Sequence, residues 1–120
     1  RDRDSGIWYQ VLDQGGREGN YLEGSGSAMF TYVFARAAKK GYLDKKYLDI
    51  ANEAFDGIVR ELITIGENGH LTMHNIVGGC GLGGNPYRDG SYEYYITEKR
   101  VDNDTKGVAP FILAALELDR

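Results

Sequence analysis

The chain has 120 residues, 42% of them hydrophobic and 27% charged, which is the composition of one globular domain and not of a disordered or fibrous protein. Its 18 acidic and 14 basic side chains give a net charge of −4, which argues against nucleic acid and anionic membranes as partners. The single cysteine excludes an intrachain disulfide, and the longest apolar run, residues 108–116, falls short of the roughly 20 residues that a membrane-spanning helix needs. We therefore expect a soluble protein, with the cytoplasm and the periplasm both open as its compartment.

The chain begins Arg1-Asp2-Arg3-Asp4, without an initiator methionine or the apolar stretch of a signal peptide. We expect it to be the interior of a longer protein. The 17 glycines are about twice the usual share, and tyrosine is the most frequent aromatic residue. Both features indicate long, shaped loops that carry aromatic rings with polar tips.

A pair of helices is predicted in the first half of the chain. Between about Glu23 and Lys40 apolar side chains recur at helical spacing, and Gly41 follows as a natural C-terminal stop. Between Asp44 and Ile63 a second apolar stripe opposes charged residues, and the carboxylate of Asp44 is placed to cap the first turn. The short connection between the two segments predicts an antiparallel helical hairpin.

The second half mixes loops with shorter elements. Asn68-Gly69, flanked by apolar residues, predicts a two-residue turn in a β-hairpin between residues 63 and 76. The glycine-rich stretch from Gly78 to Gly84 favours an irregular loop. Residues 107–118 are apolar nearly all round, which predicts a helix that is buried on several sides and has Pro110 in its first turn.

Three patterns that elsewhere mark functional sites have simpler explanations here. The glycines at 79, 81 and 84 match the spacing of a dinucleotide-binding motif, but a turn follows where the helix should begin, so we interpret them as a loop. His70 and His74 would lie roughly 13 Å apart on a strand, too far to share one metal ion. Cys80 has no histidine close to it in the sequence, which favours a buried or loop thiol over a catalytic nucleophile.

Polar and aromatic side chains are densest in residues 85–95, with smaller groups around Trp8 and Ser25. Aromatic rings of this kind stack on sugars, and an arginine such as Arg88, held by the neighbouring Asp89, can bind a substrate carboxylate through two hydrogen bonds. A purely structural explanation stays open for each group. In that case Arg88 and Asp89 tie down a loop, Trp8 belongs to the core and Ser25 caps a helix.

Four segments together resemble the C-terminal part of one enzyme family. They are residues 6–13 (GIWYQVLD), 19–30 (GNYLEGSGSAMF), 86–95 (PYRDGSYEYY) and 103–114 (NDTKGVAPFILA). In this order they resemble the unsaturated rhamnogalacturonyl hydrolases of glycoside hydrolase family 105, to which the unsaturated glucuronyl hydrolases of family 88 are related. The resemblance covers nearly the whole chain, which makes it far more specific than any single motif.

The resemblance implies a mainly α fold, namely part of an (α/α)6 barrel with a small β-hairpin and long glycine-rich loops. Residues 1–120 would be the C-terminal segment of a single catalytic domain, because so few helices cannot close a barrel of six helical hairpins. In this family an aspartic acid protonates the C4=C5 double bond of a terminal 4,5-unsaturated uronic acid, which a lyase leaves on pectin (rhamnogalacturonan) or related oligosaccharides. Water adds at C5, and the resulting hemiketal rearranges and breaks the glycosidic link without the paired carboxylates of ordinary glycosidases.

No segment of this chain matches the family's catalytic motifs. The catalytic acid is therefore expected upstream of residue 1, and Asp13, Asp89 and Asp104 are not assigned that role. The resemblance implies neither a cofactor nor a metal. We expect the chain to supply one wall of the substrate pocket, with five side chains that face a common concavity and bind the oligosaccharide substrate: Trp8, Gln10, Glu23, Tyr87 and Arg88. Among these, Arg88 is expected to contact a carboxylate or hydroxyl, and Trp8 or Tyr87 to stack on a sugar ring.

The small number of elements also predicts apolar surface that this chain cannot cover by itself. We expect the N-terminal remainder of the barrel, or self-association, to cover it. The competing hypothesis is a non-catalytic helical module for carbohydrate binding or assembly, which would keep the sugar-facing loops without the catalytic acid.

Overall fold

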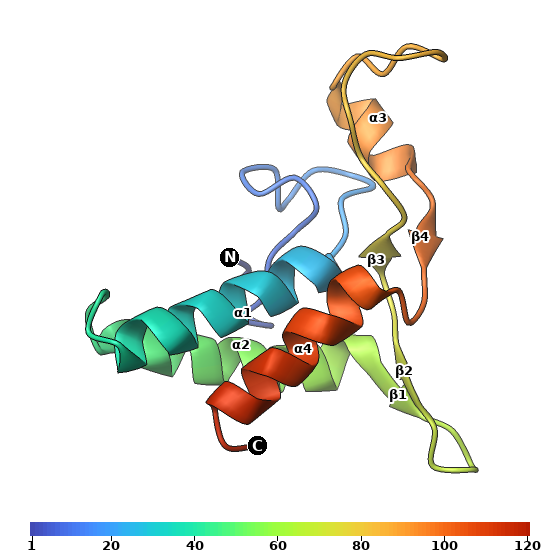
Figure 1. Cartoon of the computed structure of the whole chain (residues 1–120). Helices are drawn as coiled ribbons and strands as arrows, with labels where there is room; N and C mark the ends of the chain where they lie inside the picture. Colours follow the sequence, from blue (N-terminus) through green and yellow to red (C-terminus); the bar gives the residue numbers. More distant parts are fainter.

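The computed structural model describes all residues from 1 to 120 and is mainly α-helical (Figure 1). Its elements follow the chain in the order α1 (Gly24–Lys39), α2 (Lys46–Leu62), β1 (Ile63–Ile65), β2 (Leu71–Met73), β3 (Ile76–Val77), α3 (Tyr92–Thr97), β4 (Arg100–Val101) and α4 (Thr105–Glu117). α1 is the central helix, because α2 and α4 both pack along it. No helix combines the length and the apolar character that crossing a membrane would require.

α1 and α2 form the predicted helical hairpin. After the end of α1 at Lys39, Gly41 has a φ of +75°, the left-handed conformation that lets the chain turn back. α2 begins at Lys46, and the carboxylate of Asp44 accepts a hydrogen bond from the Lys46 backbone N–H at 2.9 Å. Asp44 therefore stabilises the first turn of α2, although the helix itself begins two residues later.

Two small antiparallel sheets follow α2. β1 pairs with β2, Ile63 opposite Met73, which confirms the predicted β-hairpin. The strands are connected by residues 66–70, which is longer than the two-residue turn that Asn68-Gly69 predicted. Within this connection the Gly66 N–H donates to the His70 carbonyl at 2.9 Å, so the turn that they close contains three residues. β3 pairs with β4 in a second sheet that the sequence pattern did not predict, since each strand has only two residues.

α4 differs from its prediction in where it begins. Its N-cap is Asp104, whose side chain accepts a hydrogen bond from the Lys106 N–H at 2.9 Å, so the helix begins at Thr105 and Pro110 lies in the second turn and not in the first. Its outer side is left uncovered within this chain, as the small number of elements predicted. Gly107 and Ala114 are its only buried residues, and large apolar side chains are exposed on its outer side: Ile112, Leu113 and Leu116.

The core lies between α1 and its neighbours in two clusters. The first consists of Ile7, Ala28, Ala54, Ile58, Leu62, Met73 and Ile76. The second consists of Ala35, Ala51, Phe55, Ala114 and Leu118. The N-terminal segment takes part in the first cluster through Ile7, and it packs closely on α2 because Gly57 has no side chain: a Cβ there would lie 2.0 Å from the Ser5 carbonyl oxygen.

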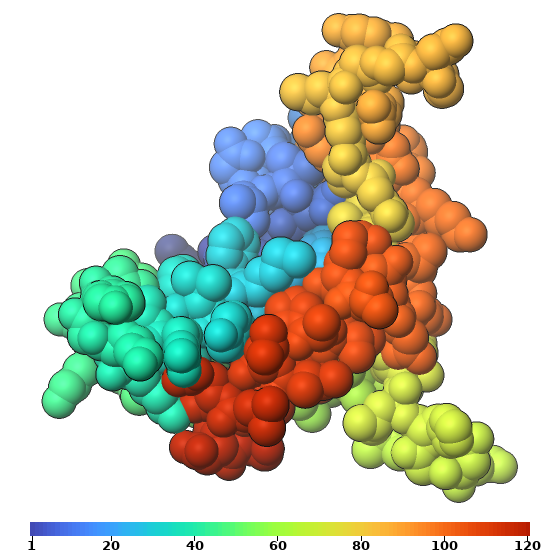
Figure 2. Space-filling view, viewed as in Figure 1, coloured from blue at the N-terminus to red at the C-terminus, as the bar shows by residue number.

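Residues 78–99 form an arm that projects from the helical body, which is the rest of the chain (Figure 2). The arm contains the glycine-rich stretch, which is a loop as predicted, and α3. Ser91 caps α3, accepting a hydrogen bond from the Tyr94 N–H at 3.1 Å. None of the arm's residues is buried. The molecule therefore combines a packed body with an arm that has no core of its own.

Candidate functional site

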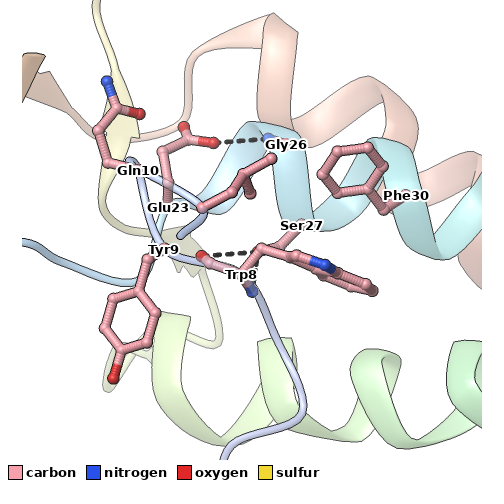
Figure 3. Close-up of a pocket in the computed structure, with 8 residues that line it drawn as sticks. Trp8, Tyr9, Gln10, Glu23, Gly26, Ser27 and Phe30 are labelled. Carbon is pink, nitrogen blue, oxygen red and sulfur yellow. Dashed lines mark hydrogen bonds between the residues drawn. The ribbon is translucent and has the colours of Figure 1, made fainter. Parts of the chain in front are cut away.

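A hollow of about 200 Å³ opens at the N-terminal end of α1 (Figure 3). We call it the α1 hollow, and its lining consists of Trp8, Tyr9, Gln10, Leu12, Glu23, Gly26, Ser27 and Phe30. The N-terminal segment reaches this place because Tyr9 and Leu22 pair as an antiparallel bridge just before α1 begins. The hollow thus joins two segments that the sequence had marked separately.

Trp8 forms the aromatic side of the α1 hollow together with Phe30 (Figure 3). The Trp8 N–H donates to Ser27 Oγ at 3.0 Å, and the Trp8 carbonyl accepts from the Glu23 N–H at 2.9 Å, so its main chain is fixed against the start of α1. The indole centroid lies 5.1 Å from that of Phe30 and 5.8 Å from that of Phe34, in tilted arrangements that aromatic rings favour. Core contacts therefore hold the half-buried ring at the edge of the hollow.

Glu23 is the N-cap of α1, in place of Ser25. It is only 5% exposed, and both of its oxygens accept hydrogen bonds from within the protein. The four donors are the Ser25 N–H at 3.0 Å, the Ser25 hydroxyl at 2.7 Å, the Gly26 N–H at 2.6 Å and the Val77 N–H at 3.0 Å. A carboxylate at a helix N-terminus is also favoured by the helix dipole. Glu23 therefore joins α1 to β3 and shapes the hollow, with no oxygen left without a partner.

Gln10 extends to the side of the hollow opposite Trp8 and Phe30 (Figure 3). Its Nε2 lies 3.3 Å from Cys80 Sγ and 3.3 Å from the Tyr95 carbonyl oxygen, and both acceptors belong to the arm. Its side-chain oxygen makes no such bond. Gln10 thus connects the α1 hollow to the arm.

A second hollow, of about 390 Å³, lies on the arm. We call it the arm hollow, and its lining consists of Asn85, Pro86, Tyr87, Arg88, Tyr94 and Glu98. Tyr87 is 78% exposed and presents most of its ring to solvent. A hydrogen bond to Glu98 is the largest cause that raises the pKa of Tyr94, so its hydroxyl remains protonated at neutral pH. Tyr94 and Glu98 were not among the predicted site residues, although Tyr94 lies in the polar and aromatic segment.

The glycine-rich loop surrounds the guanidinium of Arg88. Arg88 Nε donates to the Gly83 carbonyl at 2.9 Å, and Nη2 lies 3.5 Å from the Leu82 carbonyl. A Cβ at Gly81 would lie 2.6 Å from Arg88 Nη1, and one at Gly84 would lie 3.0 Å from Nη2. The glycines therefore make room for an arginine side chain, which is a different use from the phosphate binding that their spacing suggests elsewhere.

Arg88 and Asp89 do not pair with each other, contrary to the expectation from their adjacency. Asp89 accepts a hydrogen bond from the Ser91 N–H at 2.9 Å, and this bonding to Ser91 lowers the pKa of the Asp89 carboxyl. Arg88 forms no ion pair with any carboxylate of the chain and is oriented by carbonyl oxygens alone. Its positive charge is held in place and remains available to an anion from outside.

The five side chains predicted to share one concavity are divided between two hollows. Trp8, Gln10 and Glu23 meet in the α1 hollow, whereas Tyr87 and Arg88 lie in the arm hollow. The division arises because the arm projects from the body and carries residues 85–95 away from the start of α1. These side chains thus lie in two separate hollows, and Gln10 connects the α1 hollow to the arm through Cys80 and Tyr95.

The side chains with other candidate roles have structural partners. Desolvation is the largest cause that raises the pKa of the Cys80 thiol, so the exposed sulfur stays protonated at neutral pH and is a poor nucleophile. The ring nitrogens of His74 face Thr64 Oγ1 at 2.7 Å and Asp102 Oδ1 at 3.0 Å. No aspartate lines the α1 hollow. The two hollows thus offer aromatic rings and a fixed cation, and the carboxylate of Glu98 lines the arm hollow.

Comparisons with known proteins agree with this architecture. The model of the family described as Glycosyl Hydrolase Family 88 matches residues 1–120. The chain is 41% identical over 123 aligned positions to Protein Atu3128 of Agrobacterium fabrum and, equally, to the 24.9 kDa protein in the picA locus of Rhizobium radiobacter, covering 98% of this chain and 53% of each relative. The chain therefore spans about half the length of these curated relatives.

Solved structures show the same relation. A Clostridium acetobutylicum glycoside hydrolase from family 105 superposes with a TM-score of 0.95 at 44% identity, over 98% of this chain and 33% of that protein. A possible member of the same family from Salmonella enterica superposes with a TM-score of 0.75 at 27% identity, over 97% of this chain and 27% of that protein. The mainly α fold is thus that of part of an (α/α)6 barrel, and the chain belongs to glycosyl hydrolase family 88.

Proposed function

We propose that this chain forms one wall of the substrate pocket of a glycoside hydrolase that removes a terminal 4,5-unsaturated uronic acid from lyase-generated pectin (rhamnogalacturonan) or related oligosaccharides. Membership of glycosyl hydrolase family 88 and the likeness to a family 105 hydrolase support the class of reaction. The residues would be the C-terminal segment of a single barrel-shaped catalytic domain, which agrees with the one third of the Clostridium protein that the chain covers.

The proposal rests on Arg88, whose guanidinium is held in place without a carboxylate partner in the chain. Its guanidinium is oriented by the Gly83 and Leu82 carbonyls. A uronic acid brings the missing carboxylate, and a planar guanidinium matches it through two hydrogen bonds. Tyr87, exposed beside Arg88, would stack on the same sugar, and Trp8 would contact another sugar in the α1 hollow.

Gln10 and Glu23 have supporting parts in this proposal. The side-chain oxygen of Gln10 is free to accept a hydrogen bond from a sugar hydroxyl, while its nitrogen stays bonded to the arm. Glu23 keeps the start of α1 in position through bonds within the protein. The two hollows would then contact different parts of one oligosaccharide.

In the proposed reaction the chemical step belongs to an aspartic acid outside residues 1–120. A proton adds at C4 of the unsaturated sugar and water adds at C5, which gives a hemiketal. Its rearrangement opens the sugar ring and breaks the glycosidic link. This chain would orient the oligosaccharide, and the reaction would need no cofactor or metal.

The proposed partner of this wall is the rest of the barrel. Ile112, Leu113 and Leu116 form an exposed apolar stripe on α4, in which Leu116 follows Ile112 by four residues and Leu113 by three, the spacing of a helix face that packs against a neighbour. We propose that the N-terminal remainder of the barrel covers this stripe in the complete protein, and that self-association covers it when the chain is alone.

The test uses the complete protein, an unsaturated uronyl disaccharide and its methyl ester, with loss of the double bond's ultraviolet absorbance as the readout. Arg88→Ala should raise the KM of the acid by roughly 10- to 100-fold, the value of a charged hydrogen bond pair, and that of the neutral ester much less. Arg36→Ala is the matched control, because Arg36 is an exposed arginine whose partner is Glu117, away from both hollows.

An equal effect of Arg88→Ala on the acid and the ester would contradict the role of Arg88 as the carboxylate partner. Binding of the disaccharide without any turnover by the complete protein would instead favour the competing function, a non-catalytic carbohydrate-binding or assembly module.

A further inference from the structure

The arm is attached to the helical body at two places. At its base β3 pairs with β4, and the Gly78 N–H donates to the Lys99 carbonyl at 2.7 Å. Further out, α3 contacts residues 10–20 of the N-terminal segment, which we call the support loop. The base alone would allow the arm to swing, because the chain that leaves it is rich in glycine from Gly78 to Gly84. The support loop is thus the place where the direction of the arm is decided.

Arg17 of the support loop contacts α3 through two interactions of its guanidinium. Its Cζ lies 3.7 Å from the centroid of the Tyr92 ring, and its Nη2 lies 2.7 Å from Glu93 Oε1. The Tyr92 hydroxyl returns the contact, since its oxygen lies 3.1 Å from the Arg17 carbonyl and 3.0 Å from the Glu18 carbonyl, which share its one proton. The arginine is therefore engaged through both its side chain and its main chain.

The support loop has the rigidity that such a role needs. The Asn20 side chain donates to the carbonyls of Val11 and Gln14, both at 2.9 Å, and accepts from the Val11 N–H at 3.1 Å. Gly19 has a φ of +85°, and a Cβ there would lie 2.7 Å from Ile96 Cδ1, so the loop passes directly against α3. These internal hydrogen bonds fix the conformation of the support loop, so the loop can hold α3, and with it the arm, in one position.

We propose that Arg17 is a positioning residue that, through Tyr92 and Glu93, fixes the arm hollow relative to the α1 hollow. This inference rests on the proposed function of the two hollows as contacts to one oligosaccharide. Arg17 touches neither hollow, and it acts by setting the separation between Arg88 and Trp8. Without it, the arm samples several directions, and each substrate molecule selects the matching one at a cost in affinity.

The geometric half of the proposal is tested by spin-label distances in the full chain, with labelled molecules diluted into unlabelled ones so that self-association adds no intermolecular distance. Labels are placed at Tyr42→Cys on the body and Tyr87→Cys on the arm, two positions that are 81% and 78% exposed, with Cys80→Ser to leave no other thiol. The parent should give one narrow distance distribution. Arg17→Ala should broaden it, and Tyr92→Phe, which keeps the ring and removes only the hydroxyl, should broaden it less.

Arg36→Ala is the matched control, because the Arg36 side chain is 51% exposed with one ion pair at 3.0 Å, whereas that of Arg17 is 47% exposed with one at 2.7 Å. It should leave the distribution unchanged. An Arg17→Ala distribution as narrow as that of the parent would overturn the proposal. Helical circular dichroism of each variant shows that the body is folded, so that broadening reports on the arm and not on unfolding.

The functional half is tested by kinetics of the complete protein. Arg17→Ala should raise the KM of the unsaturated disaccharide about three- to tenfold, the range of an exposed ion pair with a cation–π contact, and leave kcat unchanged. A broadened distance with an unchanged KM would overturn the claim that Arg17 serves substrate binding. Absence of turnover in the parent would contradict the proposed function, and the distance measurement would still decide whether Arg17 positions the arm.

Discussion

The helical body and the arm of this protein are stabilised in different ways. In the body, residues such as Ile7 and Ile58 are completely buried, so its shape follows from close packing of apolar groups. In the arm no residue is buried, and its geometry depends on single polar contacts such as those of Arg17 and Arg88. Packing energy is spread over many atoms, whereas surface polar contacts are few and individually weak. Substitutions in the body should therefore change stability, and substitutions in the arm should change geometry and binding.

The largest effect on stability is expected from Ile58→Ala in the body. Ile58 is 0% exposed in the first core cluster, and truncation of such a side chain costs about 2–5 kcal/mol of the free energy of unfolding. Its neighbour Val59 is 44% exposed, so Val59→Ala is the matched control and should cost much less. Urea denaturation measures both. Equal losses for the two variants would contradict the division between core and surface.

The next largest effect is expected from Glu23→Gln, where body and arm meet. The amide keeps one acceptor oxygen, but its NH2 group must face either the Gly26 N–H or the N–H donors of Ser25 and Val77, and the charge at the helix N-terminus is lost. We expect a loss of about 1–3 kcal/mol in urea denaturation. If stability were unchanged, Glu23 would be a side chain free for ligand binding and not the link that its contacts indicate.

The outer side of α4 is an exception within the body, because its apolar side chains are exposed to solvent. Leu116 is 70% exposed, and the 120-residue chain alone should self-associate through this apolar stripe. Leu116→Glu should shift sedimentation toward the monomer without a loss of stability. A parent chain that sediments as a monomer at high concentration would mean that the segment is self-sufficient.

The chain alone should show no turnover of an unsaturated uronyl disaccharide, and measurable turnover would mean that one of its own carboxylates is catalytic.

A small change in the arm should affect binding with almost no effect on stability. In Gly81→Ala the new Cβ would lie 2.6 Å from Arg88 Nη1, and the flexible arginine would have to move out of its position. We expect less than about 0.5 kcal/mol of stability change, typical of surface substitutions, together with a higher KM for the uronyl substrate of the complete protein. Gly79→Ala, where a Cβ would meet no atom within 4 Å, is the matched control and should leave KM unchanged.

The smallest effect is expected in the acid range, at the cap of α4. Bonding to Lys106 is the largest cause that lowers the pKa of Asp104 below 3.8, so its contribution to stability is present above that pH and is lost as the pH falls through the lowered pKa. An asparagine at this position would also cap the helix but would not titrate. Urea midpoints of Asp104→Asn at pH 7 should lie slightly below those of the parent, because the charged contribution and the Lys106 ion pair are lost, and they should fall less below about pH 4. Identical acid profiles would show that the cap does not depend on charge.

The sequence predicted those parts of the fold that local patterns determine. The apolar spacing in residues 46–62 predicted α2, and Gly41 predicted the turn before it, because helix periodicity and glycine conformation are local properties. β3 and β4 were missed, since two residues give no period. The cap of α1 was missed for a different reason: glutamate is not among the preferred N-cap residues, and one of its donors, Val77, lies 54 positions along the chain.

The sequence indicated most of the side chains around the two hollows but not how they are arranged. The polar and aromatic segments contained most of the side chains that line the two hollows, because such residues are unusual at this density, but Glu98 of the arm hollow lies outside them. Adjacency suggested that Asp89 holds Arg88, but the backbone directs Asp89 to Ser91 and leaves the guanidinium to the glycine loop. Whether the two loops share one concavity depends on the direction of the arm. That direction depends on contacts such as the one between Arg17 and Glu93, which are 76 positions apart in the sequence.

The base of the arm has a consequence for how proteins of this kind diversify. Because β3 and β4 are adjacent antiparallel strands, the chain enters and leaves the arm at neighbouring points, with Gly78 and Lys99 joined by a hydrogen bond. An insertion with its ends this close can be lengthened, shortened or exchanged without moving the helices that carry it. The arm is thus a natural unit for grafting: a segment of another length, closed by the same two-stranded base, would bring new side chains to the substrate while α1, α2 and α4 stay as they are.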